Sequence, residues 1–241
     1  GASESVSVWE QMYGDARTDD QRLNILLKIM DLKDQQSVPF LMRALEDVNN
    51  RRIEEGTSNE QYEKITLARL IMQEMGSLGV TDAVPLIWEI FRNSRFPYLR
   101  ADAAMALGRM RANDLAPHLI RELSTLNNPP LDPQTQDEEI LAYGLVNALG
   151  NMRLRESFEV MFMASEAWYP PTYRVKEGAK RVLASLVEDP SDDLLMVAVK
   201  NLSTSIRTAA LKASLASRAS PEQKAKVARG ILRLSLDRGV N

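Results

Sequence analysis

The chain has 241 residues, with 30 Lys and Arg against 33 Asp and Glu, no Cys and a single His. This length suits one large domain with a sizeable core or two small domains, and the formal charge of −3 suggests little electrostatic character. The absence of Cys excludes disulfide scaffolds, Cys-ligated zinc sites and Cys nucleophiles, and a Ser-His-Asp triad would have to use His118.

Apolar residues recur at helical spacing along most of the chain, and no stretch alternates as a strand does. The pattern predicts a leading helix at about 4–13, whose Val8, Trp9 and Met12 cap the first of six helix pairs. In chain order the predicted pairs are 20–33/37–49, 60–78/82–93, 97–110/114–126, 137–151/155–167, 172–188/191–201 and 204–217/221–238. We therefore expect a capping segment, 1–19, and a repeat domain, 20–241.

Short phrases recur at the ends and starts of these predicted helices. Three first helices end alike, in Glu74–Leu78, Ala106–Met110 and Ala148–Met152. Three second helices carry a proline in the first turn, where its missing N–H is harmless. These prolines are Pro39, Pro85 and Pro117. Such self-similarity is typical of repeat proteins, in which neighbouring helix pairs share one continuous core.

The best copy is Leu99–Met110, continued by Asp114, Pro117 and Leu119. It resembles the HEAT-repeat family, in particular the short HEAT-like repeats of phycobilin-lyase subunits, and the resemblance covers about residues 20–238. It implies an all-α fold, a right-handed α-solenoid of about six helix pairs behind the N-terminal capping helix. Lys176 and Arg207 take the place of Arg100 in the last two repeats. The resemblance concerns the fold and carries no function by itself.

The second helices are the first candidate binding surface, because in HEAT proteins, which this chain resembles, they typically line the concave side. The outward residues expected on them are Arg43, Asp47, Arg92, His118, Arg121 and Glu122. Phe158–Met163 is apolar almost all round, and Trp88 has apolar neighbours at helical spacing. Both are expected in the core, with a groove for a partner helix as the alternative.

The loops between pairs are the second candidate surface, because insertions confined to one edge of a solenoid often mark its binding side. Long connections are expected near 50–59 and 127–136, and an aromatic one at 167–171. The aromatic residues expected in or beside this edge are Phe96, Tyr98, Trp168, Tyr169 and Tyr173. The alternative is that these rings pack on helix ends and close the core.

Charge is divided unevenly along the chain. Residues after 194 include nine basic and two acidic side chains, a charge of +7, whereas residues 1–194 carry 21 and 31, a charge of −10. Lys226, Arg229 and Arg233 fall on one face of the last predicted helix. They are a candidate site for an anionic ligand, nucleic acid or anionic lipid, with a solvated terminal helix as the alternative.

The acidic clusters indicate helix capping rather than catalysis. Asp19-Asp20, Asp137-Glu138-Glu139 and Asp192-Asp193 stand at predicted helix starts, where acids complement the helix dipole, and Glu54-Glu55 lies in a polar loop. The sequence contains no Gly-rich phosphate loop, nucleophile elbow or metal-ligand spacing. We therefore expect no enzymatic activity, no cofactor and no metal.

The expected role is a non-enzymatic scaffold or adaptor that binds a protein partner through the second helices, the loop edge or both. The first alternative is binding of an anionic ligand by the basic C-terminal repeats. The further alternatives are a lyase subunit, because bilin lyases have similar repeats, and a DNA glycosylase. Bacterial alkylpurine DNA glycosylases resemble this chain in size and helix content. Nucleic acid is not an expected partner, because the central repeats are acidic where the groove of such an enzyme is strongly basic.

No apolar run approaches the roughly 18 residues of a membrane span. Residues 1–10 contain neither the basic nor the apolar region of a signal peptide and no initiator Met, so we expect a trimmed or mature chain. For a mature chain, the absence of Cys favours the bacterial periplasm or another extracytoplasmic site; otherwise the cytoplasm is expected.

Overall fold

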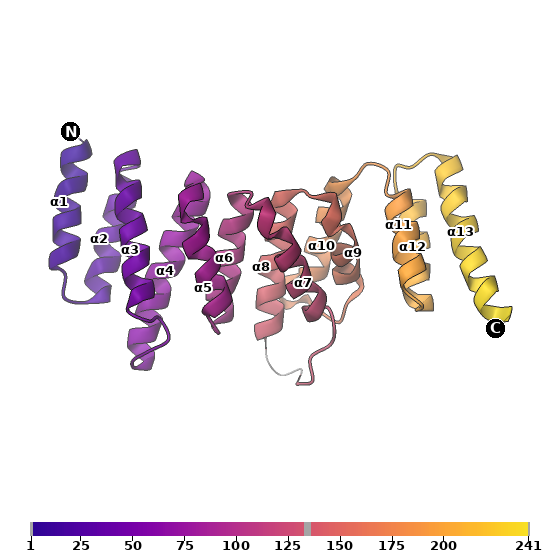
Figure 1. The fold of residues 1–241 in the computed structure, drawn as a ribbon, viewed down its shortest axis with the longest axis horizontal. Coiled ribbons are helices and arrows are strands. Elements are labelled where there is room, and N and C mark those ends of the chain that lie inside the picture. The colour runs from indigo at the N-terminus through magenta and orange to yellow at the C-terminus, as the bar shows by residue number, and fades with distance from the viewer. Residues whose placement is uncertain (1, 133–135, 241) are drawn as a thin grey trace. The chain divides into compact units, whose positions relative to one another are not determined.

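The computed structural model describes residues 2–132 and 136–240, and every regular element within these ranges is helical (Figure 1). In chain order the α-helices are α1 (Ala2–Asp15), α2 (Asp19–Asp31), α3 (Val38–Asn50), α4 (Ser58–Leu78), α5 (Val84–Asn93), α6 (Pro97–Arg109), α7 (Ala116–Leu126), α8 (Asp137–Met152), α9 (Phe158–Glu166), α10 (Val175–Leu186), α11 (Ser191–Lys200), α12 (Thr204–Ala216) and α13 (Pro221–Val240). The all-α prediction is confirmed, and α1 and the pairs from α2/α3 to α12/α13 match the predicted elements in order.

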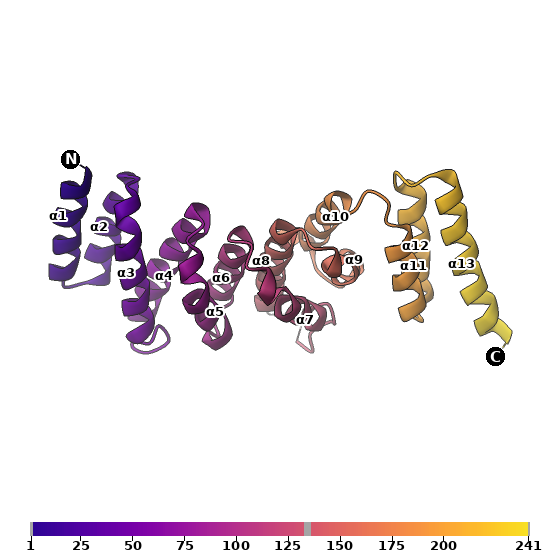
Figure 2. The ribbon, with the colours of Figure 1, turned by 45° about the horizontal axis from the view of Figure 1, so that its top comes forward.

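The chain forms two compact units. Unit 1 comprises Gly1–Leu119 with Thr135–Met152, and unit 2 comprises Ile120–Gln134 with Arg153–Asn241. Within unit 1 the first helices α4, α6 and α8 pack side by side in both views (Figures 1 and 2). Within unit 2, α9 packs on α10, and α11 packs on α12 and α13.

The first four helix pairs share one turn geometry. Each first helix is followed by a residue in the left-handed region, with φ of 50°, 67°, 54° and 55° at Lys33, Gly79, Arg111 and Arg153. A short 3₁₀ turn begins two residues later, and the second helix begins five residues later in every case. The structural repeat is therefore more regular than the sequence repeat. The last two pairs depart from it, because Val187 and Ser217 follow their first helices in extended conformation.

Small residues let α6 approach α8 closely in unit 1. A Cβ added to Gly108 would lie 2.6 Å from both the Cα and the carbonyl oxygen of Ala148. A Cβ added to Gly144 would likewise lie 2.7 Å from the Cα of Ala101. Backbone atoms cannot move aside as a flexible side chain can, so these two glycines set the distance between the helices.

Basic side chains bind the carbonyl oxygens left free at the ends of second helices. Arg100 Nε donates to the carbonyl oxygen of Phe91, nine residues earlier, at 2.9 Å. Arg207 Nε donates to that of Ala198, also nine residues earlier, at 3.1 Å, and to that of Asn201 at 3.1 Å. The predicted equivalence of Arg100 and Arg207 is thus realised as the same hydrogen bond, from Nε to a carbonyl oxygen near the end of a second helix.

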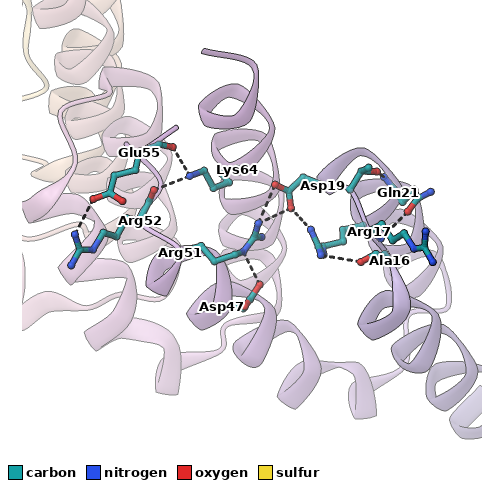
Figure 3. Close-up of polar contacts among 11 residues, drawn as sticks. Ala16, Arg17, Asp19, Gln21, Asp47, Arg51, Arg52, Glu55 and Lys64 are labelled. Carbon is teal, nitrogen blue, oxygen red and sulfur yellow. Dashed lines mark hydrogen bonds and ion pairs between the residues drawn. The ribbon is translucent and has the colours of Figure 1, made fainter. Parts of the chain in front are cut away.

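The long connection after α3 is fastened by side chains (Figure 3). Lys64, which is buried in α4, donates from Nζ to the carbonyl oxygens of Arg52 at 2.9 Å and Glu55 at 2.6 Å. Arg51 pairs with Asp47 at 3.0 Å and with Asp19, at the start of α2, at 3.0 Å. This loop is therefore an ordered extension of the helix pair, held by hydrogen bonds that a flexible insertion lacks.

The leading helix α1 packs through a face that only partly matches the predicted one. Val6 and Tyr13 are buried, and the Tyr13 ring meets Phe40 edge-on with centroids 4.9 Å apart. Val8 and Met12, expected to cap the first pair, are 57% and 46% exposed. Trp9, the third residue expected there, is half-buried and lies three residues after Val6 and four before Tyr13, on the same helix face. The prediction was therefore wrong for Val8 and Met12, which lie on the other apolar face of α1.

Tyr13 makes the stability of unit 1 sensitive to alkaline pH. Burial, reinforced by Asp47, raises the pKa of Tyr13 to about 12, whereas an unfolded tyrosine titrates near 10. As pH rises past 10 the unfolded chain loses this proton first, so the free energy of unfolding falls between about pH 10 and 12. Tyr13→Phe should leave stability within about 0.5 kcal/mol of wild type at pH 7 and flatten that fall. Urea unfolding of both proteins at pH 7 and across the range from about pH 10 to 12 tests this prediction. An equal alkaline fall in the free energy of unfolding of wild type and Tyr13→Phe would contradict it.

Candidate functional site

The strongest candidate surface in unit 1 lies on the second helices α5 and the start of α7. The rings of Trp88 and His118 lie 5.3 Å apart at an angle of 47°, and Trp88 stacks on Phe91 at 5.4 Å and 13°. Phe91 is buried, and the Arg100 guanidinium lies over its ring, 4.6 Å from the ring centroid. A rigid base of core residues therefore holds a half-buried indole and an exposed imidazole at the surface.

Charged side chains lie three or four residues from each of these rings on its own helix, on α7 within the part that belongs to unit 2. Arg92, which is exposed, follows Trp88 by four residues on α5, and Arg121 and Glu122 follow His118 by three and four residues on α7. Residues three or four apart lie on one helix face, so each helix presents an aromatic and a charged group together. Trp88, which was predicted to lie in the core, is half-buried, so part of it is accessible to solvent.

The predicted residues of α3 are engaged within the first helix pairs. Arg43 lies 3.5 Å from Glu10 of α1, and Asp47 accepts from Arg51 at 3.0 Å. Both predicted residues are exposed, and ion pairs of this kind contribute little to stability. Arg43 and Asp47 therefore belong to the exposed polar surface of α3.

Two of the aromatic residues predicted for the loop edge are structural. Tyr169 is only 3% exposed, and its hydroxyl donates to Asn127 Oδ1 at 2.8 Å. Trp168 Nε1 donates to the carbonyl oxygen of Leu126 at 2.9 Å, and Asn127 Nδ2 donates to that of Val160 at 3.2 Å. Burial also raises the pKa of Tyr169 far above its usual range. This pair closes the core of unit 2, which is the alternative interpretation of the loop aromatics.

The other three loop aromatics are half-buried or exposed. Tyr98 is 45% exposed, with the Arg69 guanidinium 5.2 Å from its ring centroid. Arg95 lies in the same way over Phe96, at 5.7 Å. Tyr173 is half-buried in a short 3₁₀ turn before α10. Phe96 and Tyr98 belong to unit 1, and Tyr173 belongs to unit 2.

The basic stripe of α13 lies on the exposed face of that helix. Lys226 lies 3.6 Å from Asp192 in a solvent-exposed pair, and Arg229 and Arg233 are exposed without an ion pair among the described residues. Asp192 and Asp193 belong to the first turn of α11, as Asp137–Glu139 do to that of α8 and Asp19-Asp20 to that of α2. The acidic clusters thus occupy the predicted capping positions.

Sequence reasoning missed a cavity in unit 2. It measures about 900 Å³ and lies among α9, α10, the start of α11 and α12. Phe158 and Phe162, expected either in the core or in a groove, are 5% and 3% exposed and form part of its floor. The only signal in the sequence was the apolar run Phe158–Met163, because the cavity depends on the spacing of α10 and α12.

The described part of the chain contains no group of three or more His, Asp or Glu side chains placed to hold a metal ion. None of its helices is both long and apolar enough to cross a membrane. No family model, no curated protein and no solved structure matches this chain. The likeness to HEAT repeats therefore stays a prediction from the sequence.

Proposed function

We propose that this chain is a non-enzymatic scaffold of HEAT-like repeats that binds a protein partner through its second helices. The observation that carries the proposal is the Trp88–His118 pair, a solvent-accessible aromatic contact between α5 and α7 with Arg92 beside it on α5. Tryptophan and arginine are the residues most enriched among those that dominate binding energy in protein interfaces.

The rigidity of this surface supports the same role. In the pairs α2/α3, α4/α5 and α6/α7, a residue in the left-handed region follows the first helix, and the second helix begins five residues after it. Trp88 rests on buried Phe91, which Arg100 holds in turn. A surface formed before binding loses little conformational entropy on association, so it gains affinity from a small number of anchors.

A paired capture experiment tests the proposal. Wild-type protein and Arg92→Glu/His118→Asp are used to capture proteins from an extract of the source organism, with Arg109→Glu as the matched control. Arg109 is exposed on α6, a first helix of the same unit. We expect a partner that the control retains and the double variant loses by at least about tenfold, since removing an anchor costs 2 kcal/mol or more. Equal capture by all three proteins would contradict this surface.

A further inference from the structure

The cavity of unit 2 has an apolar interior. Its floor includes Phe158, Phe162 and Leu194, which belong to the buried core cluster of this unit. Its walls include Leu183 and Val187 at the end of α10 and Ala209 and Ala213 along α12. The side chains of α12 that face the cavity are mostly small, which leaves the space between the two first helices open. A volume of about 900 Å³ lies within the range of small-molecule sites, roughly 300–1,000 Å³.

The rim of this cavity carries charged side chains that form no ion pairs with other described residues. Lys180, Lys212 and Arg218 line it together with Glu166 and Glu188, and all five are exposed. None of the five forms an ion pair with another described residue, although the same unit pairs Arg155 with Asp193 and Lys200 with Glu159. Of the three cations, Lys212 lies on α12 and Arg218 follows two residues after the end of that helix.

We propose that this cavity binds a medium-chain fatty acid, with the alkyl chain over Phe158 and Phe162 and the carboxylate at Lys212 and Arg218. An alkyl chain suits the apolar floor, because its burial removes apolar surface from water on both sides. A carboxylate suits two unpaired cations, since charge-assisted hydrogen bonds to Arg and Lys are among the strong ones. The inference is independent of the proposed partner surface in unit 1.

This site differs from the predicted anionic site on α13. Lys226, Arg229 and Arg233 offer charge on an exposed helix face, whereas Lys212 and Arg218 border a cavity that an apolar chain can enter. The cavity site therefore requires a ligand with both an anionic group and a hydrophobic tail. A ligand with only one of these properties would leave either the cations or the apolar floor without a partner.

Calorimetric titration with dodecanoate tests the proposal directly. We expect one-to-one binding, and about tenfold weaker binding of decanoate because two methylene groups fewer are buried. Dodecyltrimethylammonium, which has an alkyl chain of nearly the same length and the opposite charge, should bind at least about tenfold more weakly. Lys212→Glu/Arg218→Glu should remove the preference for the anion. Lys226→Glu, outside the cavity, should bind dodecanoate as wild type does.

A variant that fills the cavity locates the binding. Ala184→Trp places a ring in the cavity wall at an exposed position of α10, so the helix need not be disturbed. It should lower dodecanoate affinity at least tenfold with an unchanged circular dichroism spectrum. No binding to wild type, equal affinity for the cationic amphiphile, or full binding to Ala184→Trp would each overturn the proposal. So would binding of phosphatidylglycerol vesicles in place of free dodecanoate.

Discussion

Gly108→Val should lower the free energy of unfolding by about 3 kcal/mol, the largest effect expected from a single substitution in unit 1. The new side chain would begin 2.6 Å from the backbone of Ala148, so α6 and α8 must separate along a contact that also includes Ala101 and Gly144. For a chain of this size the change corresponds to a fall of roughly 6–12 °C in Tm. Thermal and urea unfolding followed by circular dichroism measure it.

Gly14→Ala is the matched control for that prediction. Gly14 also lies in an α-helix, α1, but no atom lies within 4 Å of a Cβ added there. We expect stability equal to wild type or higher by up to about 1 kcal/mol, because Ala is the better helix former. Equal stability of Gly108→Val and wild type would show that α6 and α8 do not approach closely.

Arg207→Met should destabilise unit 2 by about 2–3 kcal/mol. Arg207 is only 6% exposed, and Met retains most of its apolar volume while removing the donor to the carbonyl oxygens of Ala198 and Asn201. A buried acceptor left without a donor costs its full desolvation penalty. Urea unfolding, with hydrogen exchange of the α11 and α12 amides, measures the loss and locates it.

Two comparisons separate this capping role from a general effect of charge. Arg207→Lys retains an ammonium donor and should lose less stability than Arg207→Met. Lys226→Met removes an exposed cation whose only described pair, with Asp192 at 3.6 Å, is solvent-exposed, so its effect should stay within about 0.5 kcal/mol. Equal losses for Arg207→Met and Lys226→Met would contradict the capping role.

Helix positions were predictable because they depend on local pattern. Apolar spacing and prolines 39, 85 and 117 located the pairs to within a few residues, and each of these prolines lies in the first turn of its second helix. The turn geometry was less predictable. Three of its four left-handed positions are Lys33, Arg111 and Arg153, residue types that give no signal for a conformation usually taken by Gly.

The candidate sites were less predictable because they depend on tertiary packing. Nothing in the sequence shows that Tyr169 is buried and Trp168 half-buried, because both positions depend on their hydrogen bonds to Asn127 and Leu126. The second-helix residues His118 and Arg92 were found from periodicity, because an outward helix face follows from the inward one. The cavity of unit 2 leaves no such trace, since it lies between helices rather than on one of them.

The most direct test of partner binding by the second helices is photocrosslinking with benzoylphenylalanine in place of His118, with the same residue in place of Arg109 as control. Both positions are exposed, and they lie on a second and a first helix respectively. We predict a covalent adduct of one discrete partner mass from position 118, and none from position 109, after irradiation in an extract of the source organism. No adduct at position 118, or the same adduct at both positions, would contradict partner binding at this surface.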